Sequence, residues 1–374
     1  MSFDSPIRII VADYNAVDRN TISKAINQFA QTDVISRVNN LNDIPDKISS
    51  LKPDILILDL EIPGLRLGLF LPKLKNLHPE LEIVLVSSKH RTSSESSLKA
   101  LELGAMYFIK KPSRSNPGNH LEYYQKYFRP VINLYSVTRT ARKVRASNLN
   151  GISTLAQTPE KLISDKQSKR LNNYKILAVG SSLGGPEALK KLIPGLPANF
   201  PLPVVITQHM PAGFTATLAE TLDERSSLIV REARGAEIIR PGYAYLAPGG
   251  YHMLIKKCLL QNKTDYIIYL DNGPEIHGCR PSVDTMLNSL AESMAGNVLA
   301  VILTGMGEDG RDGVQNLKQA GKCLCVTQDE ASSVVYGMPG SVYKAGLSDL
   351  SVSIDNMSAK VDELVRIKPA VISI

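Results

Sequence analysis

Short apolar runs alternate with amphipathic stretches along most of the chain. In the first third, four runs predict buried strands, at residues 7–13, 54–60, 81–88 and 105–112. The spacing of apolar residues predicts helices over Asp18–Phe29 and Ser96–Leu103. Strands that alternate with helices form a parallel sheet with helices on both faces, and strands that are apolar throughout are buried on both faces.

A second alternating series begins at Asn173. It contains seven apolar runs that predict strands, at residues 175–180, 203–209, 243–248, 251–255, 265–271, 297–305 and 322–328. Ser282 is expected to cap a helix over Val283–Met294. The turn Pro248-Gly249-Gly250 has hairpin chemistry and predicts an antiparallel portion of this sheet. The predicted fold class is α/β, with two doubly wound domains, the first flavodoxin-like and the second largely parallel with an antiparallel hairpin portion.

A chain of 374 residues indicates two domains and a connector. The predicted domains are residues 1–118 and 173–374, and residues 119–172 form the linker between them. The linker begins with a mixed helix over His120–Arg145, interrupted by Pro130, and then becomes polar. From His120 to Lys175 the sequence holds eleven Lys or Arg against three acids, so the net charge of +7 is concentrated there. Without a recognition motif, this favours a solvated connector over a nucleic-acid partner.

Several protein classes are disfavoured by what the sequence lacks. No apolar run approaches the 18 residues of a membrane span, so membrane insertion is not expected. The first ten residues lack the basic and apolar regions of a secretory signal. The four cysteines form no CxxC pair and have no histidines at finger spacing. A cytoplasmic location is therefore expected.

The segment VGSSLGGPEA, residues 179–188, joins a predicted strand to a predicted helix. Its residues 180–184 fit G-x-S-x-G, a sharp turn that exposes the central serine, here Ser182, as a nucleophile. Glycine-rich turns also bind phosphate, but Ser182 stands where a dinucleotide motif needs its second glycine. Two alternatives remain: Ser182 as a helix cap, and Ser181 as the nucleophile.

A serine nucleophile needs a base and a group that orients the base. His209 ends the strand PVVITQH, and Asp309 lies in the loop after the strand NVLAVIL. Because ligands bind outside the carboxyl ends of strands in a doubly wound sheet, Ser182, His209 and Asp309 are expected at one edge. The order Ser, His, Asp differs from that of α/β-hydrolases. His252 and His277 are competing bases, but neither ends a predicted strand.

Six segments resemble, in order, the signature segments of bacterial chemotaxis protein-glutamate methylesterases: GSSLGGPEA, ITQHMPAGFT, YLAPGGYHM, RPSVDTM, VILTGMGEDG and QDEASSVVYGMPG. The resemblance covers about residues 174–368. It implies that Ser182 is the nucleophile, His209 the general base, Asp309 its orienting acid, and the amide of Met306 a donor to the oxyanion.

The implied reaction is hydrolysis of glutamate γ-methyl esters on chemoreceptors, without a cofactor or catalytic metal, and deamidation of receptor glutamines is common in the family. One position departs from the family pattern: Leu183 stands where threonine usually follows the serine. The resemblance therefore leaves open how Leu183 affects activity.

Residues 6–118 resemble a response-regulator receiver domain. Asp59 matches the phospho-accepting aspartate, Ser87 the switch hydroxyl, and Lys111 the lysine that pairs with the phosphoryl group. Asp13 matches the first of two acids, but Tyr14 stands in place of the second, which is normally a Mg²⁺ ligand. The resemblance implies a chemotaxis histidine kinase as phosphodonor and release of autoinhibition on phosphorylation. Tyr14 leaves open whether Mg²⁺ binds and whether Asp59 is phosphorylated.

Three rival functions remain on the sequence alone. One is a catalytically degenerate signalling adaptor of the same architecture, marked by Leu183 and Tyr14. The second is a DNA-binding regulator that uses the basic linker. The third is a general carboxylesterase.

Overall fold

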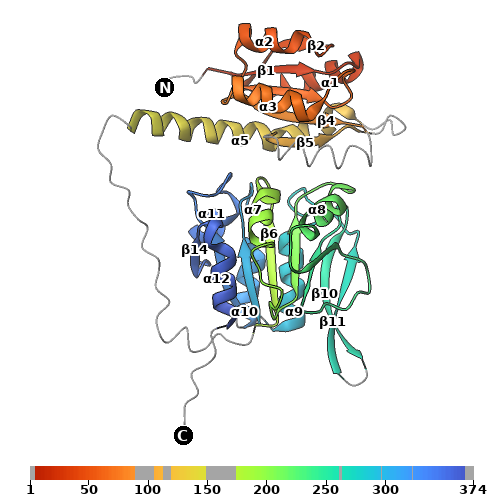
Figure 1. Ribbon diagram of the computed structural model, residues 1–374, viewed down its shortest axis with the longest axis vertical. Helices are drawn as coiled ribbons and strands as arrows, with labels where there is room; N and C mark the ends of the chain where they lie inside the picture. Colours follow the sequence, from red (N-terminus) through yellow and green to blue (C-terminus); the bar gives the residue numbers. More distant parts are fainter. Residues whose placement is uncertain are drawn as a thin grey trace. The chain divides into compact units, whose positions relative to one another are not determined.

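The computed structural model describes residues 5–88, 105–112, 119–148, 174–260, 263–295, 297–321 and 323–366. The chain forms two compact units, Met1–Leu155 and Ala156–Ile374, each with its own sheet (Figure 1). The helix predicted over Ser96–Leu103 and most of the polar linker lie outside the described residues. Within the described part of the chain, no helix combines the length and hydropathy that crossing a bilayer requires.

The first unit is built on a five-stranded sheet in the order β2-β1-β3-β4-β5. All neighbouring pairs are parallel, which confirms the predicted flavodoxin-like α/β class. Its strands are β1 (Ile7–Ala12), β2 (Thr32–Val38), β3 (Ile55–Asp59), β4 (Glu82–Ser87) and β5 (Tyr107–Lys110). Strand β2 was missed by the apolar pattern because it lies at the sheet edge and buries only its last residue fully.

Four helices of the first unit lie in the described residues: α1 (Ala16–Ile26), α2 (Asp43–Leu51), α3 (Leu67–Leu77) and α5 (His120–Asn148). Helices α1 and α5 pack against each other and cover one face of the sheet. The core on this face joins alternate residues of β1, Ile7, Ile9 and Val11, to side chains of both helices. The helix predicted over Asp18–Phe29 is therefore confirmed, with its start two residues earlier.

Helix α5 corrects the predicted interruption at Pro130, because it runs without a break from residue 120 to 148. Its buried side chains Tyr124, Phe128, Val131 and Tyr135 pack into the core of the first unit. Burial of large aromatic side chains outweighs the roughly 3 kcal/mol that proline costs inside a helix. This part of the predicted linker thus belongs to the first unit.

The second unit contains a seven-stranded sheet in the order β14-β13-β12-β6-β7-β9-β8, with every neighbouring pair parallel. Its strands are β6 (Ile176–Ser181), β7 (Val204–Gln208), β8 (Ile229–Glu232), β9 (Tyr243–Leu246), β12 (Val298–Ile302), β13 (Cys323–Gln328) and β14 (Leu350–Val352). The central strands β6, β7 and β12 are buried throughout, as their continuous apolar character predicts.

The described helices of the second unit are α7 (Gly185–Leu192), α8 (Phe214–Asp223), α9 (Val283–Met294), α10 (Arg311–Ala320), α11 (Met338–Lys344) and α12 (Ile354–Arg366). Helix α9 is central to one core cluster, where Met286, Leu287 and Leu290 meet residues of β6, β7 and α10. Helix α7 contacts α8 and α12. As predicted, Ser282 caps α9, and its hydroxyl accepts a hydrogen bond from the amide of Thr285.

The antiparallel portion exists, but it lies elsewhere than predicted. Strand β10 (His252–Leu260) pairs only with β11 (Lys263–Asp271), in a separate two-stranded sheet, and not with β9. Between β9 and β10, the amide of Gly249 donates to the hydroxyl of Thr215, and the amide of Gly250 donates to the carbonyl of Arg280. Because β9 and β10 belong to different sheets, Pro248-Gly249-Gly250 does not close a hairpin.

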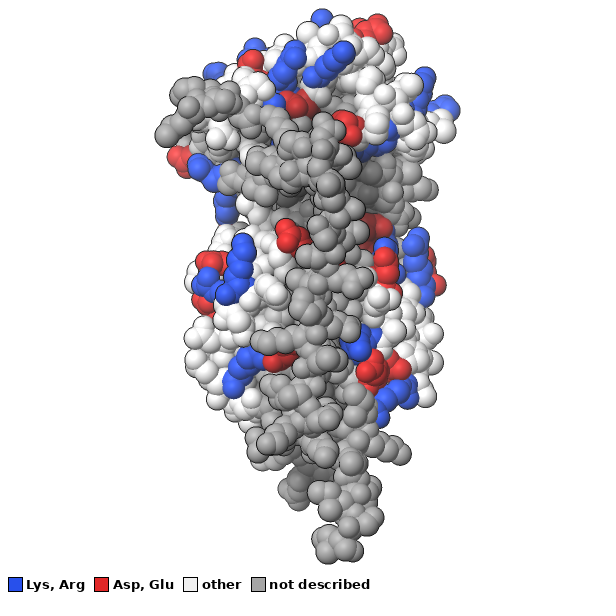
Figure 2. Space-filling model, turned by 90° about the vertical axis from the view of Figure 1, so that its left-hand side faces the viewer, with Lys and Arg blue, Asp and Glu red and all other residues white. Residues whose placement is uncertain are grey.

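Charged side chains of both signs are interspersed on the described surfaces that Figure 2 shows. Among the described residues, Arg311 pairs with Glu308 and Lys191 pairs with Asp355. The visible described surface therefore carries no continuous basic stripe of the kind that follows a nucleic-acid backbone.

Candidate active site

Three neighbouring strands of the second unit bring Ser182, His209 and Asp309 to the same edge of the sheet. Ser182 directly follows β6, His209 directly follows β7, and Asp309 lies in the loop after β12. Backbone hydrogen bonds connect the three strand ends: the amide of His209 donates to the carbonyl of Ser181 (3.0 Å), and that of Ser182 to the carbonyl of Thr304 (3.1 Å). The structure thus places the three residues together, as expected for the carboxyl ends of adjacent parallel strands.

His209 and Asp309 form a short, buried contact. Nε2 of His209 lies 2.7 Å from Oδ2 of Asp309, and the two side chains are only 10% and 2% exposed. An ionised carboxylate only accepts hydrogen bonds, so Nε2 carries the proton and Nδ1 of a neutral imidazole is left as the basic nitrogen. The arrangement therefore selects one tautomer of His209.

The carboxylate of Asp309 is bound by the N-terminus of α9. Oδ1 accepts from the hydroxyl of Ser282 (3.0 Å) and the amide of Asp284 (2.8 Å), while Oδ2 also accepts from the amide of Val283 (2.7 Å). Burial alone would raise the pKa of Asp309, but the hydrogen bonds from His209 and from these amides hold it well below its usual range. Asp309 therefore keeps its negative charge beside the imidazole.

The interaction with Asp309 shifts the pKa of His209 in the opposite direction. Burial favours its neutral form, but Cys279 and the carboxylate of Asp309 stabilise the imidazolium and raise the pKa of His209. The direction follows from the buried 2.7 Å contact with an ionised carboxylate. A base held in this way is well suited to retain a proton while a reaction intermediate exists.

Asp309, just before α10, binds amides at the start of α9, and Asp284 of α9 binds amides at the start of α10. Asp284, in the first turn of α9, accepts hydrogen bonds from the amides of Gly310 (2.9 Å) and Gly313 (2.7 Å) at the start of α10. Burial, and then the nearby charge of Asp309, raise the pKa of Asp284 to about 6. His277, Asp284 and Asp309 are close enough to share a cation, but each oxygen of Asp309 already accepts two hydrogen bonds. This favours a hydrogen-bonded network over a metal site.

The turn that exposes Ser182 is held from both sides. Nε2 of Gln208 donates to the carbonyls of Ser182 (2.8 Å) and His209 (3.0 Å). The hydroxyl of Thr304 donates to the carbonyl of Leu183 (2.9 Å). Gly184 has φ +75°, a conformation that side chains with a Cβ rarely adopt. The backbone of the turn around Ser182 is thus fixed by residues at the ends of the two strands that flank β6.

The competing residues have structural roles. Ser181 is fully buried, and its hydroxyl donates to Oε1 of Gln208 (2.7 Å). His252 is also buried, with Nε2 2.9 Å from the carbonyl of Pro274 and Nδ1 accepting from the amide of Ser282 (3.2 Å). His277 is exposed and lies 3.4 Å from Asp284. These placements favour Ser182 and His209 over the alternatives.

Met306 lies in a loop that is held by its neighbours. The amide of Gly305 donates to the carbonyl of Val335 (3.0 Å), and the carbonyl of Gly305 accepts from the amides of Gly337 (3.0 Å) and Met338 (2.8 Å). A Cβ on Gly305 would come within 2.9 Å of the Cβ of Ser182, so only glycine allows this approach. No described residue accepts a hydrogen bond from the amide of Met306, which leaves that amide available beside Ser182.

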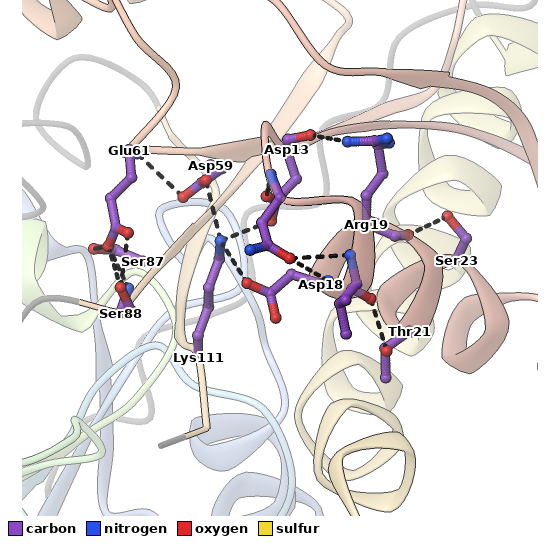
Figure 3. A network of polar contacts seen from close by, with 12 residues as sticks. Asp13, Asp18, Arg19, Thr21, Ser23, Asp59, Glu61, Ser87, Ser88 and Lys111 are labelled. Atoms are coloured by element: carbon purple, nitrogen blue, oxygen red, sulfur yellow. Dashed lines mark hydrogen bonds and ion pairs between the residues drawn. The ribbon is translucent and has the colours of Figure 1, made fainter. Parts of the chain in front are cut away.

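The first unit holds a second polar cluster at the carboxyl ends of its strands (Figure 3). Nζ of Lys111 lies 2.7 Å from Oδ2 of Asp13 and 3.0 Å from Oδ2 of Asp59. Burial raises the pKa of Asp59 to about 7: Lys111 opposes this shift, and Asp13 adds to it. Ser87 is buried, and its hydroxyl donates to Glu61 (3.1 Å). The four residues predicted from the receiver resemblance, Asp13, Asp59, Ser87 and Lys111, therefore lie in one cluster.

Tyr14 is 47% exposed and supplies no carboxylate to this cluster. Instead, Asp18 in the first turn of α1 brings a third carboxylate to Lys111, with Oδ2 3.4 Å from Nζ. The sequence pattern did not single out Asp18. An acid in the first turn of a helix is common because it interacts favourably with the helix dipole, so it gave no sign of a further role.

Comparison with known proteins assigns both domains to known families. A family model described as CheB methylesterase matches residues 177–361, and one described as response regulator receiver domain matches residues 9–118. A protein-glutamate methylesterase/protein-glutamine glutaminase of Colwellia psychrerythraea is 36% identical over 95% of this chain and 97% of its own length. The chain belongs to the CheB methylesterase family. It is therefore a carboxylic ester hydrolase with a receiver domain.

This chain is also similar to two further proteins with related names. A second such protein, from Caulobacter vibrioides, is 35% identical over 96% of this chain and 99% of its own length. The crystal structure of the Thermotoga maritima CheB methylesterase catalytic domain is 42% identical, with a TM-score of 0.49, over 51% of this chain and 99% of that one.

The contact between Ser282 and Asp309 predicts different outcomes for two serines, the cap Ser282 and Ser293 within α9. Ser282→Ala removes a buried hydrogen bond and a helix cap, so we expect the second unit to lose about 1–3 kcal/mol of stability. Ser293→Ala is the matched control: its hydroxyl is buried and has no hydrogen-bond partner among the described residues, so its loss should be neutral or stabilising. Denaturant unfolding of both variants measures the difference, and equal effects would contradict the assigned network.

Proposed function

We propose that this protein hydrolyses glutamate γ-methyl esters on chemoreceptors, with Ser182 as nucleophile. The observation that carries the proposal is the buried 2.7 Å contact between His209 and Asp309, at the sheet edge where the turn after β6 holds the half-buried Ser182. Membership of the CheB methylesterase family supports the substrate class, since its curated relatives are named protein-glutamate methylesterases.

The proposed reaction follows the serine esterase sequence. Oγ of Ser182 attacks the ester carbonyl while Nδ1 of His209 takes the hydroxyl proton, and Asp309 stabilises the resulting imidazolium. The amide of Met306 donates to the oxyanion. The intermediate then collapses, the bond to the methoxy group breaks, and methanol leaves with the proton from His209. Water repeats the sequence on the acyl-enzyme and releases the glutamate carboxylate and free Ser182.

Deamidation of receptor glutamines needs the same steps, with ammonia as the leaving group in place of methanol. The names of the relatives include protein-glutamine glutaminase, which supports this second substrate. The proposed roles of Ser182, His209 and Asp309 are the same for both reactions.

We further propose that the receiver domain regulates the esterase through phosphorylation of Asp59 by a chemotaxis histidine kinase. The contact between Asp59 and Lys111 supports this role, because a buried ammonium can bind a phosphoryl group after it is attached to the carboxylate. Asp13 and Asp59 supply oxygen ligands of the kind that Mg²⁺ prefers, and bound Mg²⁺ would neutralise phosphoryl charge. Ser87 lies in the same cluster and is the proposed switch hydroxyl.

The nucleophile is tested by substituting the two adjacent serines. Ser182→Ala should reduce methanol release from methylated chemoreceptor membranes by at least about 10⁴-fold, because no other group attacks the ester. Ser181→Ala should cost at most about tenfold, since its hydroxyl only orients Gln208. Comparable losses in the two folded variants would contradict the assignment. Absence of release from the folded wild-type chain would favour the signalling adaptor instead.

The pair of His209 and Asp309 predicts a shift in pH dependence. Because Asp309 raises the pKa of His209, the rise of kcat/KM with pH should have its midpoint above the ordinary histidine value of about 6.5. Asp309→Asn removes the charge, so the midpoint should move to lower pH while kcat falls by about 10⁴-fold. Glu308→Gln, at the exposed neighbouring position, should leave the midpoint unchanged. An unchanged or higher midpoint in Asp309→Asn would refute the electrostatic role.

Regulation by the receiver domain is tested by removing it. Residues 156–374 form a compact unit with a core of their own, so this fragment should fold. If the unphosphorylated receiver inhibits the esterase, the fragment should release methanol several-fold faster than the full chain at equal concentration. The Ser182→Ala form of the fragment is the control for background release. Equal or slower release by the folded fragment would argue against inhibition by the receiver domain.

A further inference from the structure

Three carboxylates of the first unit converge on the single ammonium of Lys111. Its Nζ lies 2.7 Å from Asp13, 3.0 Å from Asp59 and 3.4 Å from Asp18, and Figure 3 shows the three side chains pointing toward it. When ionised, these four groups carry a formal charge of −2. In that state the cluster has more negative charge than Lys111 can neutralise.

Asp13 and Asp59 each turn one oxygen toward this centre and the other toward a backbone amide. Oδ1 of Asp13 accepts from the amide of Asn15, and Oδ1 of Asp59 accepts from the amide of Glu61. Oδ2 of Asp13 and Oδ2 of Asp59 are buried, and within the described part of the unit they meet only the ammonium of Lys111, as ion pairs. Both side chains are fully buried, so water does not compensate them at the surface. Buried carboxylate oxygens in this state favour a cation.

Asp18 is held in place by the start of helix α1. Asn15 caps this helix, and its Oδ1 accepts from the amides of Val17 (3.0 Å) and Asp18 (3.1 Å). The Asp18 side chain is 15% exposed, whereas that of Tyr14 is 47% exposed and contributes no carboxylate. The cap therefore fixes an acid from the helix with its Oδ2 3.4 Å from Nζ of Lys111.

We propose that Asp18 substitutes for the acid missing at position 14 and completes, with Asp13 and Asp59, a binding site for a divalent cation such as Mg²⁺. Hard divalent cations prefer carboxylate oxygens, and Mg²⁺ is usually bound through one or two of them plus water. The remaining nearby acid, Glu61, is engaged elsewhere, since it accepts from the amide and hydroxyl of Ser88 and from the hydroxyl of Ser87. A bound divalent cation would balance the excess charge of the cluster.

A simpler role for Asp18 makes a different prediction. An acid in the first turn of a helix stabilises it by about 0.3–1 kcal/mol through the helix dipole, without any ligand. In that case Asp18→Asn would lower stability slightly and leave cation binding unchanged. Cation affinity therefore distinguishes the two roles, and it does so independently of esterase activity and of phosphorylation.

The test uses Mn²⁺ as the probe with the full chain, and free Mn²⁺ is counted by electron paramagnetic resonance. Wild type should bind one ion per chain, with Mg²⁺ competing, and Asp59→Asn should abolish binding. Asp18→Asn should weaken binding by about tenfold or more, because it removes one of the charges that face the ion. Asp46→Asn is the matched control, since it removes an exposed acid from the first turn of α2.

A rescue variant keeps the test informative if Asp18→Asn alters helix α1. Tyr14→Asp, added to Asp18→Asn, should restore affinity because it returns an acid to the end of β1. Circular dichroism shows whether each variant is folded. The proposal is overturned if wild type binds no Mn²⁺, if Asp18→Asn and Asp46→Asn bind equally well, or if Tyr14→Asp gives no rescue in a folded chain.

Discussion

The esterase site depends on how the carboxylate of Asp309 is held. In addition to its contact with His209, the carboxylate accepts hydrogen bonds from three donors at the start of α9. These donors are two backbone amides and the hydroxyl of Ser282. A buried carboxylate without such donors would gain a proton, and its hydrogen bond to the imidazole would lose most of its strength. The N-terminus of α9 therefore maintains both the charge of Asp309 and the tautomer of His209.

The same helix also joins the site to the core of the second unit. Asp284 returns a capping carboxylate to α10, and the apolar residues of α9 behind it pack on β6 and β7. Because Ser182 and His209 directly follow β6 and β7, the core that α9 forms also fixes the strands that present the proposed nucleophile and base. Gln208 and Thr304 then tie the strand ends to one another. A small shift of α9 would therefore displace all three members of the proposed triad.

The sequence predicted those parts of this arrangement that depend on interactions between residues close together in the chain. Buried strands show as apolar runs, and their last residues mark the sheet edge, which is why Ser182, His209 and Asp309 could be placed together. The cap at Ser282 also has a local signal. By contrast, Asp284 contacts amides 26 and 29 residues away, and the continuity of α5 through Pro130 depends on packing against the receiver core. Asp18 was missed because its role depends on Lys111, 93 residues later.

The two sites neutralise buried carboxylates by different means, and this determines what each can bind. In the second unit, Asp284 and Asp309 receive backbone amides from two helix N-termini, so their charges are met by fixed dipoles and by His209. In the first unit, Asp13 and Asp59 turn their inner oxygens toward one ammonium, and Asp18 adds a third charge there. Fixed backbone dipoles stabilise the negative charge of Asp309 beside His209. An excess of carboxylates around Lys111 instead favours the binding of an exchangeable cation. This difference supports the proposed catalytic role of Asp309 in one domain and the proposed cation site in the other.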